Sequence, residues 1–244
     1  MRPLTANEFL LAHDMDKTHD AADRAVAVLS FAYPEETADE LRRLPLGRRN
    51  ARLLDLRERL FGSEFYAFAE CPQCGEALEL ALDAGAIRAE EPEVVEELEM
   101  EAEGYTLRFR LLDSRDLKAA SRASGIDAAR SLLVARCVRE AWNDDRTVTV
   151  DELPPSVIEQ LSDRLEEADP QAETLLALAC PACAFEWQLP FDIASFLQAE
   201  IGAHGRRLVR EVHTLARAYG WSEADILAMS TRRRREYLEL LSND

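Results

Sequence analysis

Two short cysteine motifs constrain this chain more than any other feature of its sequence. CPQC carries Cys71 and Cys74, and CPAC carries Cys180 and Cys183. A disulfide-stapled secreted protein is usually shorter and denser in cysteine, whereas paired C-x-x-C motifs in an intracellular chain are typical of metal sites. Two such turns, brought together, offer four thiolates in a tetrahedron, which suits zinc best and iron second. We therefore predict a structural Zn²⁺ site at Cys71, Cys74, Cys180 and Cys183.

The two motifs lie far apart along the chain. Between Cys74 and Cys180 there are 105 residues, many more than a continuous zinc ribbon contains. The intervening segment must close back on itself, at an entropic cost that grows only slowly with length. The metal is therefore expected to staple two distant parts of the chain. Gly75 suits the sharp reversal of a zinc knuckle, whereas Ala184 at the equivalent place makes the second knuckle less ideal.

Other uses of the cysteines are weaker interpretations. A thiol oxidoreductase of the thioredoxin type places its motif between a strand and a helix, whereas both flanks of each motif here resemble strands. A catalytic zinc is disfavoured because four cysteines leave no open position for water. The fifth cysteine, Cys137, stands beside Val134 and Val138 and is interpreted as a small core residue with no metal or redox role.

The residue pattern predicts an α+β fold that is mainly helical. Two β-hairpin zinc knuckles, within 65–82 and 177–191, are expected to form a split zinc ribbon, and a third hairpin is expected around Gly104 in 98–112. The acidic run 90–103 is interpreted as a solvated linker or an edge strand. Helices are expected over 21–32, 35–44, 46–62 with a leucine stripe, 114–125, and 127–142 with Asp127 as a cap. The segment 147–170 is expected to begin with a short strand and to continue as a helix opened by Pro154 and Pro155. The remaining helices are expected over 193–220, as one broken helix or two adjoining helices, from Ser222, and from Thr231.

These elements suggest three regions. They are an N-terminal helical region (1–65), a split zinc-ribbon core with a helical and hairpin insertion (66–192), and a helical C-terminal region (193–244). An offset of 109 residues maps the first cysteine motif onto the second, and it also maps Leu44-Pro45 onto Leu153-Pro154 and Asp83 onto Asp192. Each half thus reads as Leu-Pro, helix, cysteine hairpin, Asp and more helix, which suggests duplicated or pseudo-symmetric halves.

Charge restricts the classes of partner. Acidic residues outnumber basic ones by 47 to 29 in the 244 residues, so the formal net charge is −18. Such a chain repels phosphates and anionic membrane surfaces. No apolar stretch reaches the roughly 18 residues of a membrane span, and the N-terminus has no long apolar segment of a signal peptide. We expect a soluble, cytoplasmic protein that does not bind membranes.

No catalytic constellation stands out, so we expect no enzyme. Phosphate-binding, dinucleotide-binding, zinc-protease and nucleophile-elbow motifs are all missing, and the histidines (His13, His19, His204 and His213) are scattered. The run Arg232–Arg235 raises the alternative of a zinc-ribbon adaptor or regulator that binds nucleic acid through its C-terminal helices. That segment is nearly neutral overall, so internal pairing of these arginines is favoured and nucleic acid is an unlikely partner.

Four segments together resemble a family of T4-like phage baseplate (hub) proteins. They are LPLGRRNARLLDLRERLFG, AECPQCGEALEL, CPACAFEWQLPF and EVHTLARAYGWSEADILAMSTRRRREYLELL. The resemblance implies a structural or assembly component of the baseplate of a contractile phage tail or a contractile injection system. It implies a hetero-oligomer with other baseplate, spike or tube proteins, in the bacterial cytoplasm or in the particle. It brings no catalytic residues, and the cysteine pairs resemble those of zinc-binding members.

Overall fold

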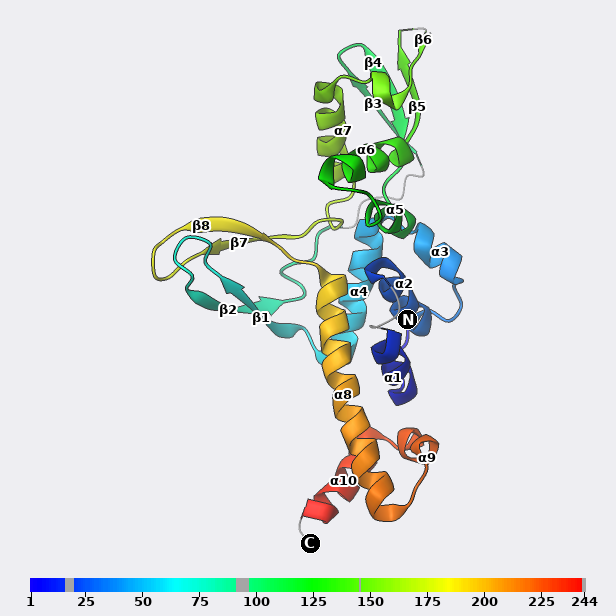
Figure 1. The fold of residues 1–244 in the computed structure, drawn as a ribbon, viewed down its shortest axis with the longest axis vertical. Coiled ribbons are helices and arrows are strands. Elements are labelled where there is room, and N and C mark those ends of the chain that lie inside the picture. The colour runs from blue at the N-terminus through cyan, green and yellow to red at the C-terminus, as the bar shows by residue number, and fades with distance from the viewer. Residues whose placement is uncertain (16–19, 91–96, 145, 243–244) are drawn as a thin grey trace.

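Helices run along the length of the molecule, and two β-hairpins project from its side (Figure 1). The computed structural model describes residues 1–15, 20–90, 97–144 and 146–242. The described residues form a helical body, a sheet lobe, a hairpin arm and a helical tip. The fold is mixed α+β with small antiparallel sheets, as the sequence predicts.

The helical body contains α1 (Ala6–Met15), α2 (Ala21–Ala32), α3 (Ala38–Arg43), α4 (Leu46–Phe61) and the first half of α8 (Ile193–Tyr219). The core of the body is built from leucines and other apolar side chains of these helices, among them Leu29, Leu41, Leu53, Leu56 and Ile201. The predicted helices over 21–32 and 46–62 are confirmed, and the one expected within 35–44 is confined to Ala38–Arg43 because Thr37 caps it. The leucine stripe of α4 faces this core.

Helix α8 is one continuous helix of 27 residues, so the prediction of a broken or divided helix is wrong. The misleading signals are Gly202 and Gly205. A Cβ atom on Gly205 would lie 2.6 Å from the Cβ of His13, so this glycine allows α1 to approach α8 closely. The packing of α1 against α8 offsets the cost of about 1 kcal/mol that a glycine brings to a helix interior.

The sheet lobe is built on four antiparallel strands in the order β3–β4–β5–β6. The strands are β3 (Leu98–Ala102), β4 (Tyr105–Phe109), β5 (Val138–Asn143) and β6 (Arg146–Thr147). Helices α6 (Ile126–Cys137) and α7 (Pro155–Ala168) complete the lobe, with a short 3₁₀ helix at Val150–Glu152. Leu107, Phe109, Val157 and Leu161 lie in the core of the lobe. The hairpin around Gly104 and the helix from Pro154 are confirmed. Of the acidic run, 91–96 lies outside the described residues.

Two predictions within this lobe are wrong. The helix expected over 127–142 ends at Cys137, because Val138–Asn143 pairs with β4 and buries Ala141 opposite Leu107. Tertiary pairing here outweighs local helix propensity. Gly125, at φ 127°, occupies the N-cap position expected for Asp127. The short strand expected at the start of 147–170 is β6, which comprises Arg146 and Thr147.

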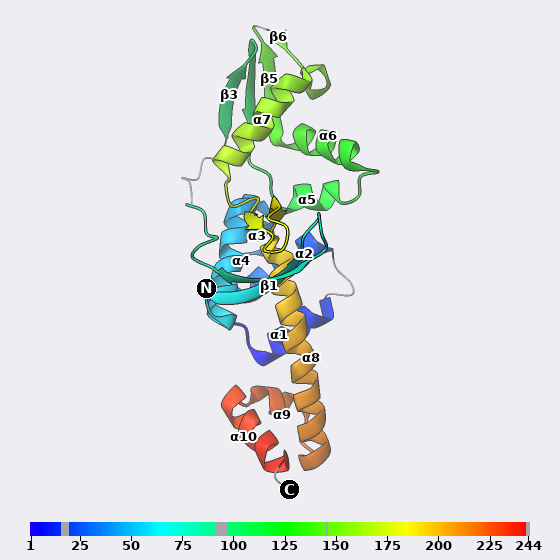
Figure 2. The ribbon, with the colours of Figure 1, turned by 90° about the vertical axis from the view of Figure 1, so that its left-hand side faces the viewer.

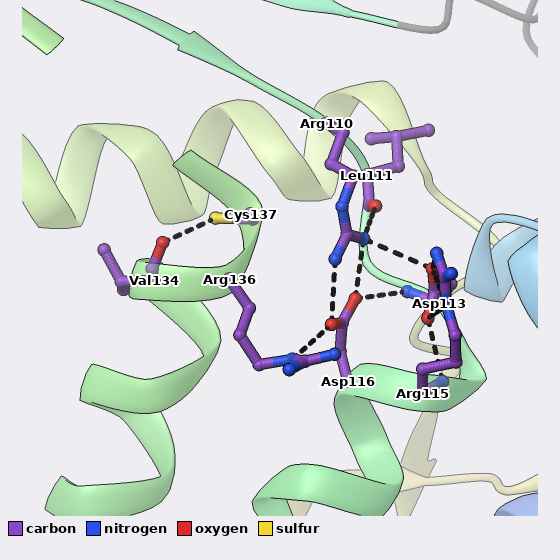
Figure 3. A network of polar contacts seen from close by, with 8 residues as sticks. All are labelled: Arg110, Leu111, Asp113, Arg115, Asp116, Val134, Arg136 and Cys137. Atoms are coloured by element: carbon purple, nitrogen blue, oxygen red, sulfur yellow. Dashed lines mark hydrogen bonds and ion pairs between the residues drawn. The ribbon is translucent and has the colours of Figure 1, made fainter. Parts of the chain in front are cut away.

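Helix α5 (Ser114–Ala120) joins the sheet lobe to the helical body. Its Asp116 is fully buried and accepts hydrogen bonds from Arg110 at 2.7 and 2.9 Å and from Arg136 of α6 at 2.7 Å (Figure 3). Burial opposes the charged form of Asp116, but the two guanidinium groups hold its pKa below the usual value. This network fixes α5 and α6 to the strand end at Arg110.

The hairpin arm consists of two separate two-stranded antiparallel sheets. One pairs β1 (Glu64–Glu70) with β2 (Ala77–Asp83), and the other pairs β7 (Leu175–Ala179) with β8 (Glu186–Pro190). Both predicted cysteine hairpins are confirmed. They project together from the helical body, beside the first turns of α8 (Figures 1 and 2). No helix follows Asp83 directly: it accepts from the N–H groups of Gly85 and Ala86, whereas Asp192 caps α8.

The helical tip contains the end of α8, α9 (Glu223–Ala228) and α10 (Thr231–Ser242). Ser222 caps α9, as predicted. The rings of Tyr219 and Trp221 stack with centroids 4.4 Å apart, and Tyr237 meets Trp221 edge-on at 4.8 Å. Tyr219 stays 37% exposed, so these rings form a partly exposed cluster rather than a closed core.

Within the described ranges, no helix combines the length and the apolar character that crossing a membrane requires.

Candidate metal centre

The two cysteine turns have the same backbone geometry. In the first, the Cys71 N–H donates to the Glu76 carbonyl and the Gly75 N–H donates to the Cys71 carbonyl, both at 2.9 Å. In the second, Cys180 and Ala184 make the equivalent bonds, again at 2.9 Å. Gly75 and Ala184 both adopt a left-handed conformation, at φ 76° and 57°. Glycine adopts this conformation freely, whereas alanine does so at a cost.

The four sulfur atoms converge on one point. All lie within 4.8 Å of one another, with 3.7 Å between the Sγ atoms of Cys71 and Cys183 and 3.6 Å between those of Cys74 and Cys180. A zinc–sulfur distance of about 2.3 Å places tetrahedral sulfurs about 3.8 Å apart. The spacing therefore fits a tetrahedral thiolate site, and it is too long for a disulfide bond, which needs about 2.05 Å. All four cysteines are free thiols.

Backbone N–H groups are directed at the sulfurs. Burial opposes the Cys71 thiolate, but N–H groups of Cys74 and Gln73 donate to its sulfur and lower its pKa to about 7. The N–H of Glu76 donates to Cys74 and that of Phe185 to Cys183. The neighbouring thiols nevertheless raise the pKa of Cys74 to about 12, because four adjacent sulfurs cannot all ionise without a cation. Backbone N–H groups thus favour thiolates at this cluster, and a bound cation would favour them further.

Each hairpin contributes one buried and one exposed cysteine. Cys71 and Cys180 are 2% and 3% exposed, while Cys74 and Cys183 are exposed. The apolar contacts beside the buried sulfurs come from Leu78, Leu80 and Trp187. This cluster is small compared with the cores of the helical body and the sheet lobe. Apolar packing alone therefore holds the two hairpin tips together only weakly.

The bases of the hairpins are held by a different set of contacts. Arg57 of α4 is 2% exposed and pairs with Glu200 of α8 through two hydrogen bonds of 2.9 Å. The same guanidinium donates to the carbonyls of Gly62 and Glu64 at the start of β1 and lies 4.3 Å from the ring centroid of Phe65. Phe65 also packs against Phe191 and Phe196, at the end of β8 and in α8. Both hairpins are thereby anchored to α4 and α8.

The base contacts could not be recognised as such from the sequence. Arg57 stands four residues after Leu53 and four before Phe61, inside the apolar stripe of α4. A charged residue in such a stripe signals a buried ion pair, although it does not identify the partner, which lies 143 residues away.

The other candidate residues lie outside the cysteine cluster. Cys137 is buried in the sheet lobe, where burial raises its pKa to about 11. The rings of His204 and Phe9 contact each other in a tilted arrangement at a centroid distance of 4.3 Å, His13 packs against Gly205, and His213 is exposed. His19 lies outside the described residues. None of these side chains adds a ligand to the cluster of four, as far as the described residues extend.

The C-terminal arginines are largely engaged within the chain. Arg234 is 2% exposed and pairs with Glu211 of α8 at 3.2 Å. Arg232 pairs with Glu236 at 2.9 Å, and Arg233 lies over the ring of Tyr237. Internal pairing, which the sequence analysis favoured, accounts for these three residues. The nucleic-acid alternative stays a prediction.

Comparison with known protein families identifies the family of this chain. A family model described as T4 bacteriophage base plate protein matches residues 2–198, which include the helical body, the sheet lobe, both cysteine turns and the start of α8. The helical tip lies outside the matched range. No curated protein and no solved structure matches the chain significantly.

Proposed function

Because the chain belongs to the T4 bacteriophage base plate protein family, whose model covers residues 2–198, we propose that it is a structural or assembly component of the baseplate of a contractile tail or a contractile injection system. Its partners in this proposal are other baseplate, spike or tube proteins within a hetero-oligomeric particle. The observation that carries the mechanism is the convergence of four cysteine sulfurs from two distant hairpins.

The proposed cofactor is one structural Zn²⁺ ion held by Cys71, Cys74, Cys180 and Cys183. The chemistry of four soft donors in a tetrahedral arrangement supports zinc, and the filled ligand set favours a structural over a catalytic ion. In this proposal the two hairpins act as the halves of a split zinc ribbon. The bound ion supplies positive charge that stabilises four adjacent thiolates.

In this proposal, contacts at the tips and at the bases of the two hairpins keep the arm rigid. The Cys71 and Cys180 turns join the tips of two hairpins, while Arg57 and Phe65 anchor their bases. The tip and base contacts together hold the arm in one direction relative to α4 and α8. A rigid projection of this kind presents fixed surfaces to neighbouring subunits, which is what an assembly component requires.

The test combines metal analysis with particle assembly. Purified protein should contain one zinc per chain, and Cys71→Ser with Cys183→Ser should remove it, whereas Cys137→Ser should retain it. Deletion of the gene should abolish assembled particles, with Cys137→Ser restoring them and the double variant restoring fewer. Intact, contractile particles without the protein would contradict the assembly role. Absence of bound metal from freshly purified protein would contradict the zinc centre separately.

A further inference from the structure

A cavity of about 380 Å³ lies at the base of the hairpin arm, on the side of α2 and α5. The first turns of α2, α4 and α8 form its walls with Lys118 of α5 and the segment 172–174. Much of the lining is apolar, with Leu46, Leu117 and Phe191 among its residues, and Arg49 supplies a cation. The cavity lies outside both cysteine turns, so it is independent of the proposed zinc centre.

Arg49 is buried, and it has no ion-pair partner among the residues that the structure describes. It is 4% exposed, and its guanidinium donates only to Oδ1 of Asn50, a neutral amide, at 2.8 and 3.1 Å. No carboxylate of the described residues forms an ion pair with it. Burial lowers its pKa, although Asp192 and Asp169 attract the charge from a distance. A buried cation left in this way is costly unless an anion completes it.

The other buried arginines form ion pairs with carboxylates of the same chain. Arg57 pairs with Glu200 and Arg234 with Glu211, and both are as deeply buried as Arg49. Among the arginines that the described ranges bury, Arg49 alone lacks an ion pair, and it alone lines this cavity. The missing carboxylate of Arg49 is therefore expected from outside the chain.

The remaining charges around the cavity are already engaged or face solvent. Lys118 pairs with Asp20 and Asp23, and Asp192 accepts from the Ala194 N–H and the Ser195 hydroxyl. Glu173 is exposed at the rim. The acidic groups disfavour a phosphate, which carries more than one negative charge, and they suit a ligand with a basic group beside its single anion.

We propose that this cavity receives a carboxylate of a partner protein's chain, flanked by an apolar and a basic side chain, with Arg49 as its ion-pairing residue. The apolar lining accepts the apolar side chain, Arg49 binds the carboxylate through its planar donor pair, and Glu173 faces the basic group. The choice of a protein as the source of the carboxylate rests on the proposed assembly role.

The direct test uses the full-length chain and the peptide N-acetyl-Lys-Leu with a free carboxyl terminus. Isothermal titration should show saturable binding that is weaker by at least about tenfold for the C-terminal amide of the same peptide. Arg49→Met should remove this difference, whereas Arg52→Met, one turn later and outside the cavity lining, should retain it. Equal binding of acid and amide, no binding of either, or preferential binding of inorganic phosphate would each overturn the proposal.

A second measurement needs no ligand. If Arg49 binds an anion from outside the chain, it does not stabilise the fold of the free protein. Arg49→Met should then leave the midpoint of thermal unfolding unchanged or raise it, whereas Arg57→Met should lower it. A large fall for Arg49→Met would show that Arg49 serves the fold of the free chain, and it would overturn the proposal. Both measurements are independent of particle assembly and of metal content, so their failure would leave the proposed function standing.

Discussion

Removing the metal from the cysteine centre should loosen the hairpin arm and leave the helical body folded. The body has its own core of leucines from α2, α4 and α8. The arm tips have only Leu78, Leu80 and Trp187 beside the buried sulfurs, and isolated two-stranded hairpins are marginal in water. The hairpin amides are thus expected to depend on the metal, and the helical amides are not.

The expected magnitude follows from the loop that the proposed ion would close. With the body folded, this loop runs from Phe65 out to Cys71, across the ion, and from Cys183 back to Phe191, where Phe65 and Phe191 are in contact. A cross-link that closes about 15 residues contributes about 3 kcal/mol in the chain-entropy account. At 1.4 kcal/mol for each factor of ten, exchange of hairpin amides should accelerate by about a hundredfold on metal removal.

Hydrogen exchange read by mass spectrometry measures this effect segment by segment. The full-length protein is compared before and after chelation, with metal content determined on both samples. Peptides from 64–83 and 175–190 should exchange faster, and peptides from α2 and α4 should not change. Cys137→Ser is the control variant, because it leaves the four clustered cysteines unchanged. Unchanged exchange in the arm after verified metal loss, or uniform unfolding of the whole chain, would refute the reasoning.

Three further predictions concern single contacts. Ala184→Gly should stabilise the second turn by about 0.5–1 kcal/mol and Gly75→Ala should destabilise the first by about 1 kcal/mol, because both positions are left-handed; urea unfolding that moves both variants in one direction would contradict this. Arg57→Met should cost about 1.5–3 kcal/mol in urea unfolding, because the half-buried Glu200 loses its charged donor, and a cost below about 0.5 kcal/mol would show that the pair is dispensable. The ion pair with Arg2 outweighs burial and lowers the pKa of Glu8 to about 2, so its stabilisation is present above about pH 4.5 and is lost as the pH falls towards 2. The difference in unfolding free energy between wild type and Glu8→Gln should therefore shrink over that range, from about 1 kcal/mol after screening at the exposed Arg2, and a constant difference would exclude Glu8 as its source.

The cysteine hairpins were predictable because local signals agree there. Alternating residues flank each motif, and Gly75 marks the first reversal. The convergence of Cys71 with Cys183 across more than a hundred residues followed from chemistry, since four soft donors are best used together. The division into three regions stays a prediction. The core of the helical body includes side chains on both sides of the predicted boundary between 66–192 and 193–244.

The errors arise where distant contacts decide the structure. Val138–Asn143 is a strand because it pairs with β4, and no residue within the segment indicates this pairing in the sequence. In the sequence, Gly205 suggests a break in the helix. In the structure, His13 of α1 occupies the space that a side chain at this position would fill. Arg49 and Arg57 stand on the same helix, and only the three-dimensional structure separates the one with an ion pair from the one without.

The arm owes its direction to two sets of contacts that differ in chemistry. At the base, Arg57 joins α4, α8 and the start of β1 through hydrogen bonds that form as the helical body folds. At the tip, the proposed ion joins the hairpins only after both have formed, because each supplies half of the ligands. In this proposal the base contacts determine the direction of the arm, and the bound ion would determine its rigidity. The carboxylate site that we propose at Arg49 lies beside that base, in a cavity lined by residues of both α4 and α8.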